Sequence, residues 1–555
     1  MHVLSAAEMQ ACDRATTESF GIPSLQLMRN AAGAVTAFAR EQFPAARSVT
    51  VLCGRGNNGG DGMMSARLLV ECGLKVNTLL LGAPEALTGD AAQAWGELTQ
   101  PMHGRVEVIT AAEALERHKG MLDVDLIVDA LLGTGFKPPL RGLAPAALEW
   151  VRASRAPILA VDLPSGWPAD ETGATQSGPV FPADAVITFT APKYAHVFGQ
   201  LTRGWRQPIV VAPIGSPEEA IVSARKQDPL HLEWSGAAAA LTQAPRAVAS
   251  NKGNFGHVLV IGGTFGSAGG KAGAPAMTAM AASRAGAGLV TAAVPAPALP
   301  VVAAVAPELM TCPLTAMPSG QIAEDNLAPD RVSALLAGKT VLAIGPGLGQ
   351  SPETAKFTTG LLSSSDLPAV IDADALNILA AQPMLLSRLS HRGKRMLVLT
   401  PHPGEMARLT GTTVAHVQAN RLEIARDFAQ RMGVTLVLKG ARTLIAHPDG
   451  RVAVNTTGNP GMAKGGSGDL LTGLIAGMIA QYPHDFARAV EAAVYLHGLS
   501  ADLAVCAGNE HTLLATDCLQ NLSQAFRFYS RDANGYVWIQ GLPVSPAAVS
   551  PEAAP

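Results

Sequence analysis

Short apolar runs alternate with longer segments of helical periodicity along the first half of the chain. The gaps between the runs are long enough for a crossover helix, and this arrangement is typical of βαβ units in a parallel sheet. The pattern predicts a first α/β domain over residues 1–225, three-layered (αβα) and Rossmann-like. Its expected strands lie at 49–53, 76–81, 126–131, 158–162, 186–190 and 209–212.

A second series of apolar runs begins at His257, after a weaker Ala-rich stretch that we take as a linker at 226–250. We expect a second α/β domain over 251–530, and a disordered, Pro- and Ala-rich tail over 531–555. A hairpin at 444–454, with Pro-Asp-Gly at its turn, indicates that the second sheet ends in antiparallel strands. The other expected elements are strands from 257 and at 289–294, 341–344, 370–372, 397–399 and 436–438, and helices at 469–480, 486–506 and 512–526.

Composition narrows the class of protein. A chain of 555 residues is too long for one hydrophobic core. The net charge of −3 and the absence of a basic run argue against nucleic-acid binding. Six cysteines without CxxC spacing argue against a zinc site or a disulfide scaffold. We find no signal sequence and no run of about 20 residues apolar enough to cross a membrane, so we expect a cytoplasmic protein without membrane contact.

The first glycine-rich loop, at 53–62, follows a predicted strand and precedes a predicted helix. Its Gly-x-Gly-x-x-Gly spacing fits a dinucleotide fingerprint, but the next strand ends at Gly82 without the carboxylate that would hold a ribose. This disfavours a dehydrogenase. The loop also carries Asn57, Asn58 and Asp61, whose oxygens can face a cation or a substrate.

Two further aspartates, Asp129 and Asp162, stand at predicted strand ends. The carboxyl ends of parallel strands share one edge of the sheet, so we expect these residues and the first loop to form one site. If each feature is considered alone, a simple turn is sufficient to explain the loop, and a helix cap is sufficient to explain each aspartate.

Together, Asn-Asn-Gly-Gly-Asp-Gly at 57–62, Asp-Ala-Leu-Leu-Gly-Thr-Gly at 129–135 and Asp-Leu-Pro-Ser-Gly at 162–166 resemble the motifs of NAD(P)H-hydrate epimerases. The resemblance implies a potassium ion held by Asn58, Asp129 and Ser165. We take Asp162 as the candidate general acid or base, a role for which burial would have to raise its pKa. The implied substrate-binding residues are Asn57, Asn58, Gly59, Gly60, Asp61, Gly133, Thr134, Gly135, Phe136, Lys137, Pro138, Pro139 and Asp162.

The second glycine-rich loop, at 458–469, ends in Gly-Gly-Ser-Gly-Asp and opens a predicted helix. Backbone N–H groups at such a helix start favour phosphate, and the helix dipole is expected to keep Asp469 ionised as a base for phosphoryl transfer. No Gly-x-x-x-x-Gly-Lys-Ser/Thr sequence occurs, which argues against a Walker-type NTPase. Alone, this loop could be a linker with an N-cap.

Glycine and polar motifs at 345–349, 372–377, 400–405 and 439–443 resemble the ribokinase-like superfamily, and more narrowly ADP-dependent NAD(P)H-hydrate dehydratases. The resemblance implies that Ala274, Gly347, His402 and Asp469 contact the hydrated dinucleotide. It also implies that Lys439, Gly440, Ala441, Arg442, Thr443 and Gly468 contact the adenine nucleotide. Asp372 and Asp374 are candidates for organising magnesium, with helix capping an equal alternative for Asp374. The loop at 266–271 lacks the aromatic residue of some family members.

These resemblances together predict a bifunctional repair enzyme. One domain would interconvert the R and S hydrates of NADH and NADPH, and the other would dehydrate the S form. The dehydration would use ADP, phosphorylate the C6 hydroxyl and eliminate phosphate, giving AMP. Family resemblance further implies a homo-oligomer. The alternatives are a true small-molecule kinase in the second domain and a catalytically silent module in the first.

Overall fold

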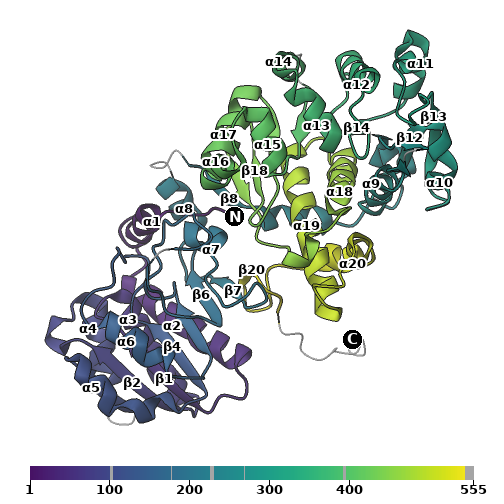
Figure 1. Cartoon of the computed structure of the whole chain (residues 1–555). Coiled ribbons are helices and arrows are strands. Elements are labelled where there is room, and N and C mark those ends of the chain that lie inside the picture. Colours follow the sequence, from purple (N-terminus) through teal and green to yellow (C-terminus); the bar gives the residue numbers. More distant parts are fainter. Residues whose placement is uncertain (100–103, 177, 226–229, 268, 392–394, 544–555) are drawn as a thin grey trace. The chain divides into compact units, whose positions relative to one another are not determined.

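The computed structural model describes residues 1–99, 104–176, 178–225, 230–267, 269–391 and 395–543 (Figure 1). Within these residues the chain forms two compact units. One contains His2–Pro229 and a C-terminal segment from Tyr529, and the other contains Leu230–Phe528 with Met1. We call them the N-terminal unit and the C-terminal unit. The N-terminal unit is therefore built from both ends of the chain.

The described part of the N-terminal unit holds a sheet of eight strands in the order β20-β7-β6-β5-β4-β1-β2-β3. All neighbours are parallel except β20, which runs antiparallel to β7. Six of the strands confirm the sequence prediction, whereas β3 and β20 were not predicted. The strands are β1 (Ser48–Cys53), β2 (Lys75–Leu81), β3 (Arg105–Ile109), β4 (Leu126–Ala130), β5 (Ile158–Val161), β6 (Ala185–Phe189), β7 (Ile209–Ala212) and β20 (Val537–Gln540).

Helices cover both faces of this sheet, which confirms the three-layer expectation. One face packs on α2, α3 and α4 through an apolar core that includes Val51, Val128 and Phe38. The other face packs on α5 and α6. The helices are α1 (Ala6–Glu18), α2 (Ser24–Gln42), α3 (Asn57–Glu71), α4 (Gly89–Leu98), α5 (Ala112–Arg117), α6 (Ala144–Arg152), α7 (Tyr194–Phe198) and α8 (Glu218–Ala224).

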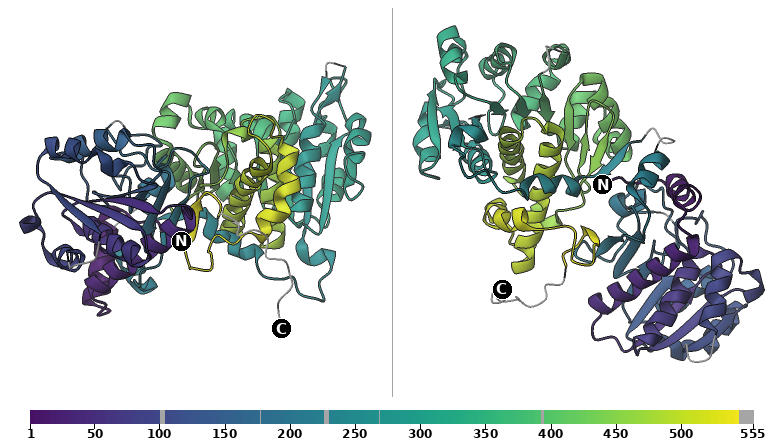
Figure 2. Two further views of the ribbon diagram at one scale, coloured as in Figure 1. Left: turned by 90° about the horizontal axis from the view of Figure 1, so that it is seen from below. Right: turned by 180° about the vertical axis from the view of Figure 1, so that it is seen from behind.

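The C-terminal strand β20 overturns part of the predicted tail. Residues 531–543 are described, and β20 pairs with β7 at the edge of the N-terminal sheet (Figures 1 and 2). Trp538 and Tyr536 pack edge-on against Phe38, with ring centroids 6.1 and 6.2 Å away. The sequence prediction went wrong because the Pro- and Ala-rich composition of the last residues hid this short aromatic strand. Residues 544–555 of the predicted tail lie outside the described residues.

The C-terminal unit has a ten-stranded sheet among its described residues, in the order β13-β12-β9-β14-β15-β16-β17-β18-β19-β8. The hairpin of β18 and β19 is antiparallel as predicted, but the parallel strand β8 lies beyond it at the edge. The strands are β8 (Leu232–Trp234), β9 (His257–Ile261), β12 (Leu289–Pro295), β13 (Met310–Leu314), β14 (Val341–Ile344), β15 (Ala369–Ile371), β16 (Leu397–Leu399), β17 (Thr435–Leu438), β18 (Leu444–Ala446) and β19 (Val452–Val454); β10 (Phe265–Gly266) and β11 (Gly269–Gly270) form a separate hairpin.

Part of the predicted linker belongs to this unit. Residues 232–234 form β8, and a 3-10 helix, η4 (Ser235–Thr242), follows it and packs on α19. Trp234 is 1% exposed and lies edge-on to Tyr495. The linker prediction is therefore wrong for these residues, because an Ala-rich stretch can pack closely although it shows no clear periodicity.

The helices of the C-terminal unit position its glycine-rich loops. The apolar helix α18 packs against α9, α19 and the strands β9 and β14 (Figure 1). The three predicted C-terminal helices are confirmed as α18, α19 and α20. The helices are α9 (Gly273–Arg284), α10 (Leu299–Ala303), α11 (Pro329–Leu336), α12 (Pro352–Ser364), α13 (Ala373–Ala380), α14 (Pro383–His391), α15 (Pro403–Thr410), α16 (Val414–Ala419), α17 (Arg421–Met432), α18 (Ser467–Gln481), α19 (Phe486–Ala507) and α20 (Ala515–Arg527).

The helix α19 differs from the expectation that no segment is apolar enough to cross a membrane. Among the described residues, α19 has the length and apolar composition of a membrane-spanning helix. However, 83% of the 18-residue apolar stretch within this helix is buried inside the protein. A core helix passes the same test, so this is weak evidence for a membrane span. The cytoplasmic location stays a prediction.

Candidate functional sites

The loop between β1 and α3 is shaped by two close backbone approaches. A Cβ atom on Gly54 would lie 2.0 Å from the carbonyl oxygen of Leu131, and one on Gly59 would lie 1.9 Å from that of Gly54. Any side chain at these positions would displace backbone atoms, so glycine is required. The tight turn presents Asn57 and Asn58, at the start of α3, to the carboxyl edge of the sheet.

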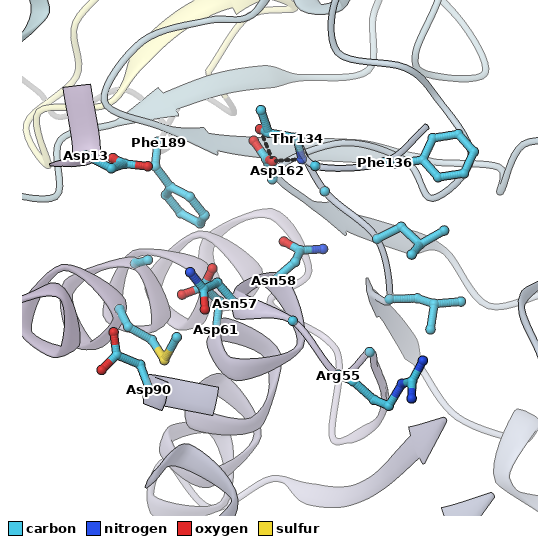
Figure 3. A pocket seen from close by; sticks show the side chains of 18 of the residues that line it. Asp13, Arg55, Asn57, Asn58, Asp61, Asp90, Thr134, Phe136, Asp162 and Phe189 are labelled. Atoms are coloured by element: carbon cyan, nitrogen blue, oxygen red, sulfur yellow. Dashed lines mark hydrogen bonds between the residues drawn. The ribbon is translucent and has the colours of Figure 1, made fainter. Parts of the chain in front are cut away.

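A cavity of about 820 Å³ lies at this edge of the N-terminal unit (Figure 3). Its lining brings together eight of the predicted substrate-binding residues: Asn57, Asn58, Asp61, Gly133, Thr134, Gly135, Phe136 and Asp162. The other predicted residues, Gly59, Gly60, Lys137, Pro138 and Pro139, do not line it. The substrate roles of all these residues stay predictions.

The three residues predicted to hold potassium include two that contact each other. Asp129 is fully buried, and its carboxylate accepts hydrogen bonds from the Ser165 hydroxyl at 2.6 Å and the Ser165 N–H at 2.8 Å. Burial raises the pKa of Asp129 to about 6. The amide oxygen and nitrogen of Asn58 are buried without a hydrogen-bond partner. An unsatisfied amide oxygen and a buried carboxylate are suitable oxygen ligands for a cation, so this residue set fits the predicted ion.

Asp162 follows β5 in a backbone conformation that is unusual for a non-glycine residue, with φ at 65°. Its carboxylate accepts hydrogen bonds from the Thr134 N–H at 2.7 Å, the Thr134 hydroxyl at 2.6 Å and the Thr188 hydroxyl at 2.9 Å. The ammonium group of Lys193 lies 2.9 Å from the same carboxylate. Strained backbone of this kind is concentrated at functional sites, where the surrounding structure enforces it.

These contacts determine the charge of Asp162. Burial by itself would raise the pKa of this carboxyl group, but the Lys193 ammonium and the hydroxyl donors hold it below its usual range. The condition that we set for Asp162 as a base, a raised pKa, is therefore not met. A carboxylate with four donors around it is a stable anion and a poor proton acceptor.

Sequence reasoning missed Lys193 and His196. Lys193 is 2% exposed and also donates to the Thr188 hydroxyl at 2.7 Å. His196 lies 2.7 Å from the carbonyl oxygen of Asp162 through Nε2, while its Nδ1 accepts from the Lys193 N–H at 2.9 Å. Burial lowers the pKa of His196 to about 4, so the imidazole is neutral. The ring bridges the backbone carbonyl of Asp162 and the backbone N–H of Lys193. The available signal was a lysine just past the end of a buried strand, at the same sheet edge.

Asp61 has the opposite electrostatic environment to Asp162. Burial raises its pKa well above the usual value, and the charges of Asp162 and Asp13 raise it further. Asp13, from α1, lines the same cavity, and desolvation raises its pKa to about 6. The cavity thus combines a carboxyl group whose pKa is held low, Asp162, with one whose pKa is raised, Asp61.

The second glycine-rich loop lies beside a buried ion pair in the C-terminal unit. The Lys439 ammonium, after β17, lies 2.8 Å from one oxygen of Asp372, whose other oxygen accepts from the Thr472 hydroxyl at 2.8 Å. A Cβ atom on Gly468 would lie 3.4 Å from the Lys439 ammonium nitrogen. The start of α18 therefore presents its N–H groups next to a fixed positive charge, an arrangement suited to a phosphate group.

Asp469 stands in the first turn of α18. Burial and the neighbouring Asp372 raise its pKa to about 6, although Lys439 partly offsets this. Burial and the like charge of Asp372 therefore outweigh the helix dipole in setting this pKa. A carboxylate that titrates near pH 6 is mostly ionised at pH 7 and is a better base than an ordinary aspartate.

The residues predicted to contact the hydrated dinucleotide lie on neighbouring loops. A Cβ atom on Gly347 would be 3.2 Å from the side chain of Ala274, so these two positions are adjacent. His402 caps α15, and its Nδ1 accepts from the Gly404 N–H at 2.9 Å. Its backbone N–H donates to Glu405 at 2.8 Å. Glu405, 3.9 Å from the Lys439 ammonium, is a buried acid without a role in the sequence prediction.

The two carboxylates predicted to organise magnesium are occupied by protein donors. Asp372 holds Lys439 and Thr472, as described above. Asp374 accepts from the Gly349 N–H at 2.9 Å and from the Gln350 amide at 2.7 Å. It therefore fixes the 345–349 loop and is not a helix cap. These contacts do not fit direct ligation of magnesium, and we derive no step through that ion.

The predicted nucleotide-binding residues 439–443 form the connection between β17 and β18. Arg421, from α17, donates to the carbonyl oxygens of Leu438, Lys439 and Arg442 at 3.2, 3.3 and 3.4 Å. The Thr443 hydroxyl donates to the Gly440 carbonyl at 2.8 Å. Sequence reasoning missed Arg421, because its partners lie on a different element.

The fold and the two sites define the class of protein: an α/β chain with a Rossmann-like unit and a ribokinase-like unit, each with a polar site at a glycine-rich loop. Family models agree with this division. Residues 24–195 match the YjeF-related protein N-terminus, and residues 258–524 match NAD(P)H-hydrate dehydratase.

Relatives match nearly the whole chain. The bifunctional NAD(P)H-hydrate repair enzyme Nnr of Moorella thermoacetica is 42% identical over 95% of this chain and 97% of its own. The Nnr enzyme of Escherichia coli K12 is 36% identical over 94% of this chain and 93% of its own. A solved ADP/ATP-dependent NAD(P)H-hydrate dehydratase of Bacillus subtilis is 33% identical, with a TM-score of 0.45, over 53% of this chain and 96% of that one. The chain belongs to the family of bifunctional NAD(P)H-hydrate repair enzymes.

Proposed function

We propose that the N-terminal unit interconverts the R and S hydrates of NADH and NADPH, and that the C-terminal unit dehydrates the S form with ADP. The observation that supports the proposal best is the pair of polar sites, one in each unit, each at a glycine-rich loop with an aspartate whose pKa burial raises. An enzyme specific for one epimer leaves the other unused, so both activities in one chain restore the whole pool.

For epimerisation we assign the proton transfer to Asp61. Its protonated carboxyl group donates to the C6 hydroxyl as the C–O bond breaks, and the N1 lone pair forms a C=N⁺ bond while water leaves. Asp162, held ionised by Lys193 and Thr134, stabilises the cation. Water then adds to the other face of C6 and returns the proton to Asp61. A potassium ion held by Asn58, Asp129 and Ser165 would supply fixed positive charge behind the cavity.

For dehydration we assign the role of base to Asp469. It takes the proton of the C6 hydroxyl as that oxygen attacks the terminal phosphate of ADP, and AMP leaves. Lys439 and the N–H groups at the start of α18 stabilise the transferring phosphoryl group. The N1 lone pair then expels phosphate from C6 and leaves a C6=N1⁺ iminium, and a water molecule takes the C5 proton as the C5=C6 double bond of NAD(P)H forms.

The proposal is tested by adding purified R and S hydrates, first with ADP and then with ATP, and following the absorbance of reduced nicotinamide. Complete recovery from the mixture requires both activities. If only the S fraction is recovered, the chain has no epimerase activity. Accumulation of a phosphorylated product without NAD(P)H identifies a true kinase. The same assay distinguishes ADP from ATP, and the homo-oligomer stays a separate prediction for light scattering.

Substitutions at the assigned aspartates separate the two sites. Asp469→Asn should abolish dehydration of the S hydrate while R-to-S conversion continues, because the sites use different residues. Asp61→Asn should abolish epimerisation and leave dehydration of the S hydrate unchanged. Loss of both activities in either variant contradicts independent sites.

A further inference from the structure

The cavity of the N-terminal unit has an uneven distribution of charged side chains. Asp13, Asp61 and Asp90 line it from α1, α3 and α4. Figure 3 shows these three on one side of Asn58 and Arg55 on the other. Carboxyl groups can bind hydroxyl and amide groups, but they do not attract phosphate. Lys193 also lines the cavity and acts on Asp13 and Asp61, but its charge is already paired with Asp162 at 2.9 Å. The Arg55 end is therefore the favourable place for the phosphate groups of a ligand.

Arg55 lies in the loop between β1 and α3 and is exposed at the cavity. Within the described part of the chain, its guanidinium has no acceptor and no ion-pair partner. Its aliphatic stem lies over Gly82, just after β2. A Cβ atom at Gly82 would be 2.5 Å from the Arg55 Cδ, so the missing side chain there makes room for the arginine.

The end of β2 is where dinucleotide-binding folds place an acidic residue against ribose hydroxyls, or an arginine against a 2′-phosphate. This chain has glycine there, with a guanidinium on top of it. The adjacent start of α3 has Gly56 as its N-cap and no side-chain cap, so backbone N–H groups remain available nearby. Arg141, also exposed, lines the same cavity.

We propose that Arg55, together with Arg141, binds a phosphate group of the dinucleotide and thereby directs the hydrated nicotinamide ring toward Asp61 and Asp162. A guanidinium presents paired N–H groups that match two phosphate oxygens. The proposal rests on the epimerase function proposed above. The phosphate is either the 2′-phosphate of the NADPH hydrate or the pyrophosphate common to both hydrates.

The test uses the full chain without ADP, so that only epimerisation is measured. Purified R hydrates of NADPH and of NADH are converted separately, and the S form is quantified by chromatography to give kcat and KM. The variants are Arg55→Ala, Arg55→Lys and the double variant with Arg141→Ala. Arg105→Ala is the matched control, because it removes one exposed positive charge from the same unit without lining the cavity.

We expect Arg55→Ala to raise KM about tenfold with little change in kcat, because the contact is equal in the ground and transition states. Arg55→Lys should recover part of the loss, since the charge remains but the paired donors do not. A rise confined to the NADPH hydrate assigns the 2′-phosphate, and an equal rise for both hydrates assigns the pyrophosphate. Both results support a phosphate site.

An unchanged KM for both hydrates in Arg55→Ala and in the double variant overturns the inference. So does an equal rise in the Arg105→Ala control, which would indicate long-range electrostatics. If the unaltered chain does not interconvert the hydrates at all, the proposed function fails, and this result is distinct from an active enzyme that is insensitive to Arg55.

Discussion

At the scale of single residues, burial raises the pKa of both Asp162 and Asp469, and their neighbours then act in opposite directions. Asp162 and Asp469 both lie in protein interiors that disfavour a charge. A lysine and three hydrogen-bond donations keep Asp162 ionised, whereas a second carboxylate raises the pKa of Asp469. The neighbours, and not the residue type, therefore distinguish the electrostatic role from the proton-transfer role.

The pKa of Asp469, raised from its ordinary value to about 6, predicts a pH dependence for dehydration. The ionised form is the base, so the rate should be constant above about pH 7 and fall tenfold per pH unit below about pH 6. Initial rates with purified S hydrate and saturating ADP test this. Asp372→Asn removes the like charge and should move the midpoint to lower pH. A wild-type midpoint near pH 4 contradicts the assignment.

Lys193→Met should impair the N-terminal unit alone. The substitution leaves Asp162 buried without its cation, and breaking such a pair typically costs about 3–5 kcal/mol. We expect a lower free energy of unfolding for this unit, measured with denaturant, and slower epimerisation at unchanged dehydration of the S hydrate. The double variant with Asp162→Asn removes the orphaned charge and should regain stability but not activity. Equal stability of Lys193→Met and the unaltered chain would refute the pairing.

At the scale of elements, loops carry the candidate chemistry and neighbouring helices fix their shape. The connection between β17 and β18 has no regular structure of its own, and Arg421 from α17 donates to three of the carbonyl oxygens at 438–442. One side chain thereby replaces the hydrogen bonds that a helix or strand would supply. The loop that we assign to the adenine nucleotide thus depends on an element outside it.

Arg421→Ala should therefore weaken nucleotide binding more than catalysis. Losing these donors loosens the loop, and we expect KM for ADP to rise about three- to tenfold with a smaller effect on kcat. Arg426→Ala, on the same helix but paired with Asp427 at the surface, is the matched control. Equal effects of the two substitutions would mean that the helix as a whole, and not the loop contact, is responsible.

At the scale of the whole molecule, the N-terminal unit is discontinuous in sequence. Its sheet is completed by β20, whose neighbours Tyr536 and Trp538 pack on Phe38 of α2. The Gln540 amide donates to the Thr202 hydroxyl at 2.9 Å. The chain therefore enters the C-terminal unit after Pro229 and returns at Tyr529, so a single cut cannot separate two intact units.

Ending the chain after Phe528 should consequently damage epimerisation, although the removed segment follows the entire dehydratase unit. We expect a lower unfolding temperature of the N-terminal unit and loss of R-to-S conversion, with dehydration of purified S hydrate retained. Ending it after Pro543 keeps β20 and is the control. Trp538→Ala, a large-to-small change at a buried site, should cost about 3–5 kcal/mol in the same unit. Unchanged epimerisation in the shorter chain contradicts this dependence.

Strand positions and glycine loops were predictable because their signals are local. Apolar runs such as 126–130 and 341–344 are buried on both faces of parallel sheets, and this requirement is visible in the residues themselves. Edge strands lack that signal: β3 and β13 have few fully buried residues, and β8 has only three residues. These strands form because a neighbour offers free backbone groups, which no local pattern records.

The sequence by itself determined two α/β units, the positions of most strands along the chain and the two glycine-rich loops, because periodicity and backbone requirements are properties of neighbouring residues. Tertiary structure alone decided which side chains meet. Lys193 beside Asp162, Asp372 beside Asp469, and Arg55 over Gly82 join elements distant in sequence. It also decided that the chain end belongs to the first unit. Charge state and sheet closure depend on such distant partners, because electrostatic energies and hydrogen bonds follow distance in space and not position along the chain.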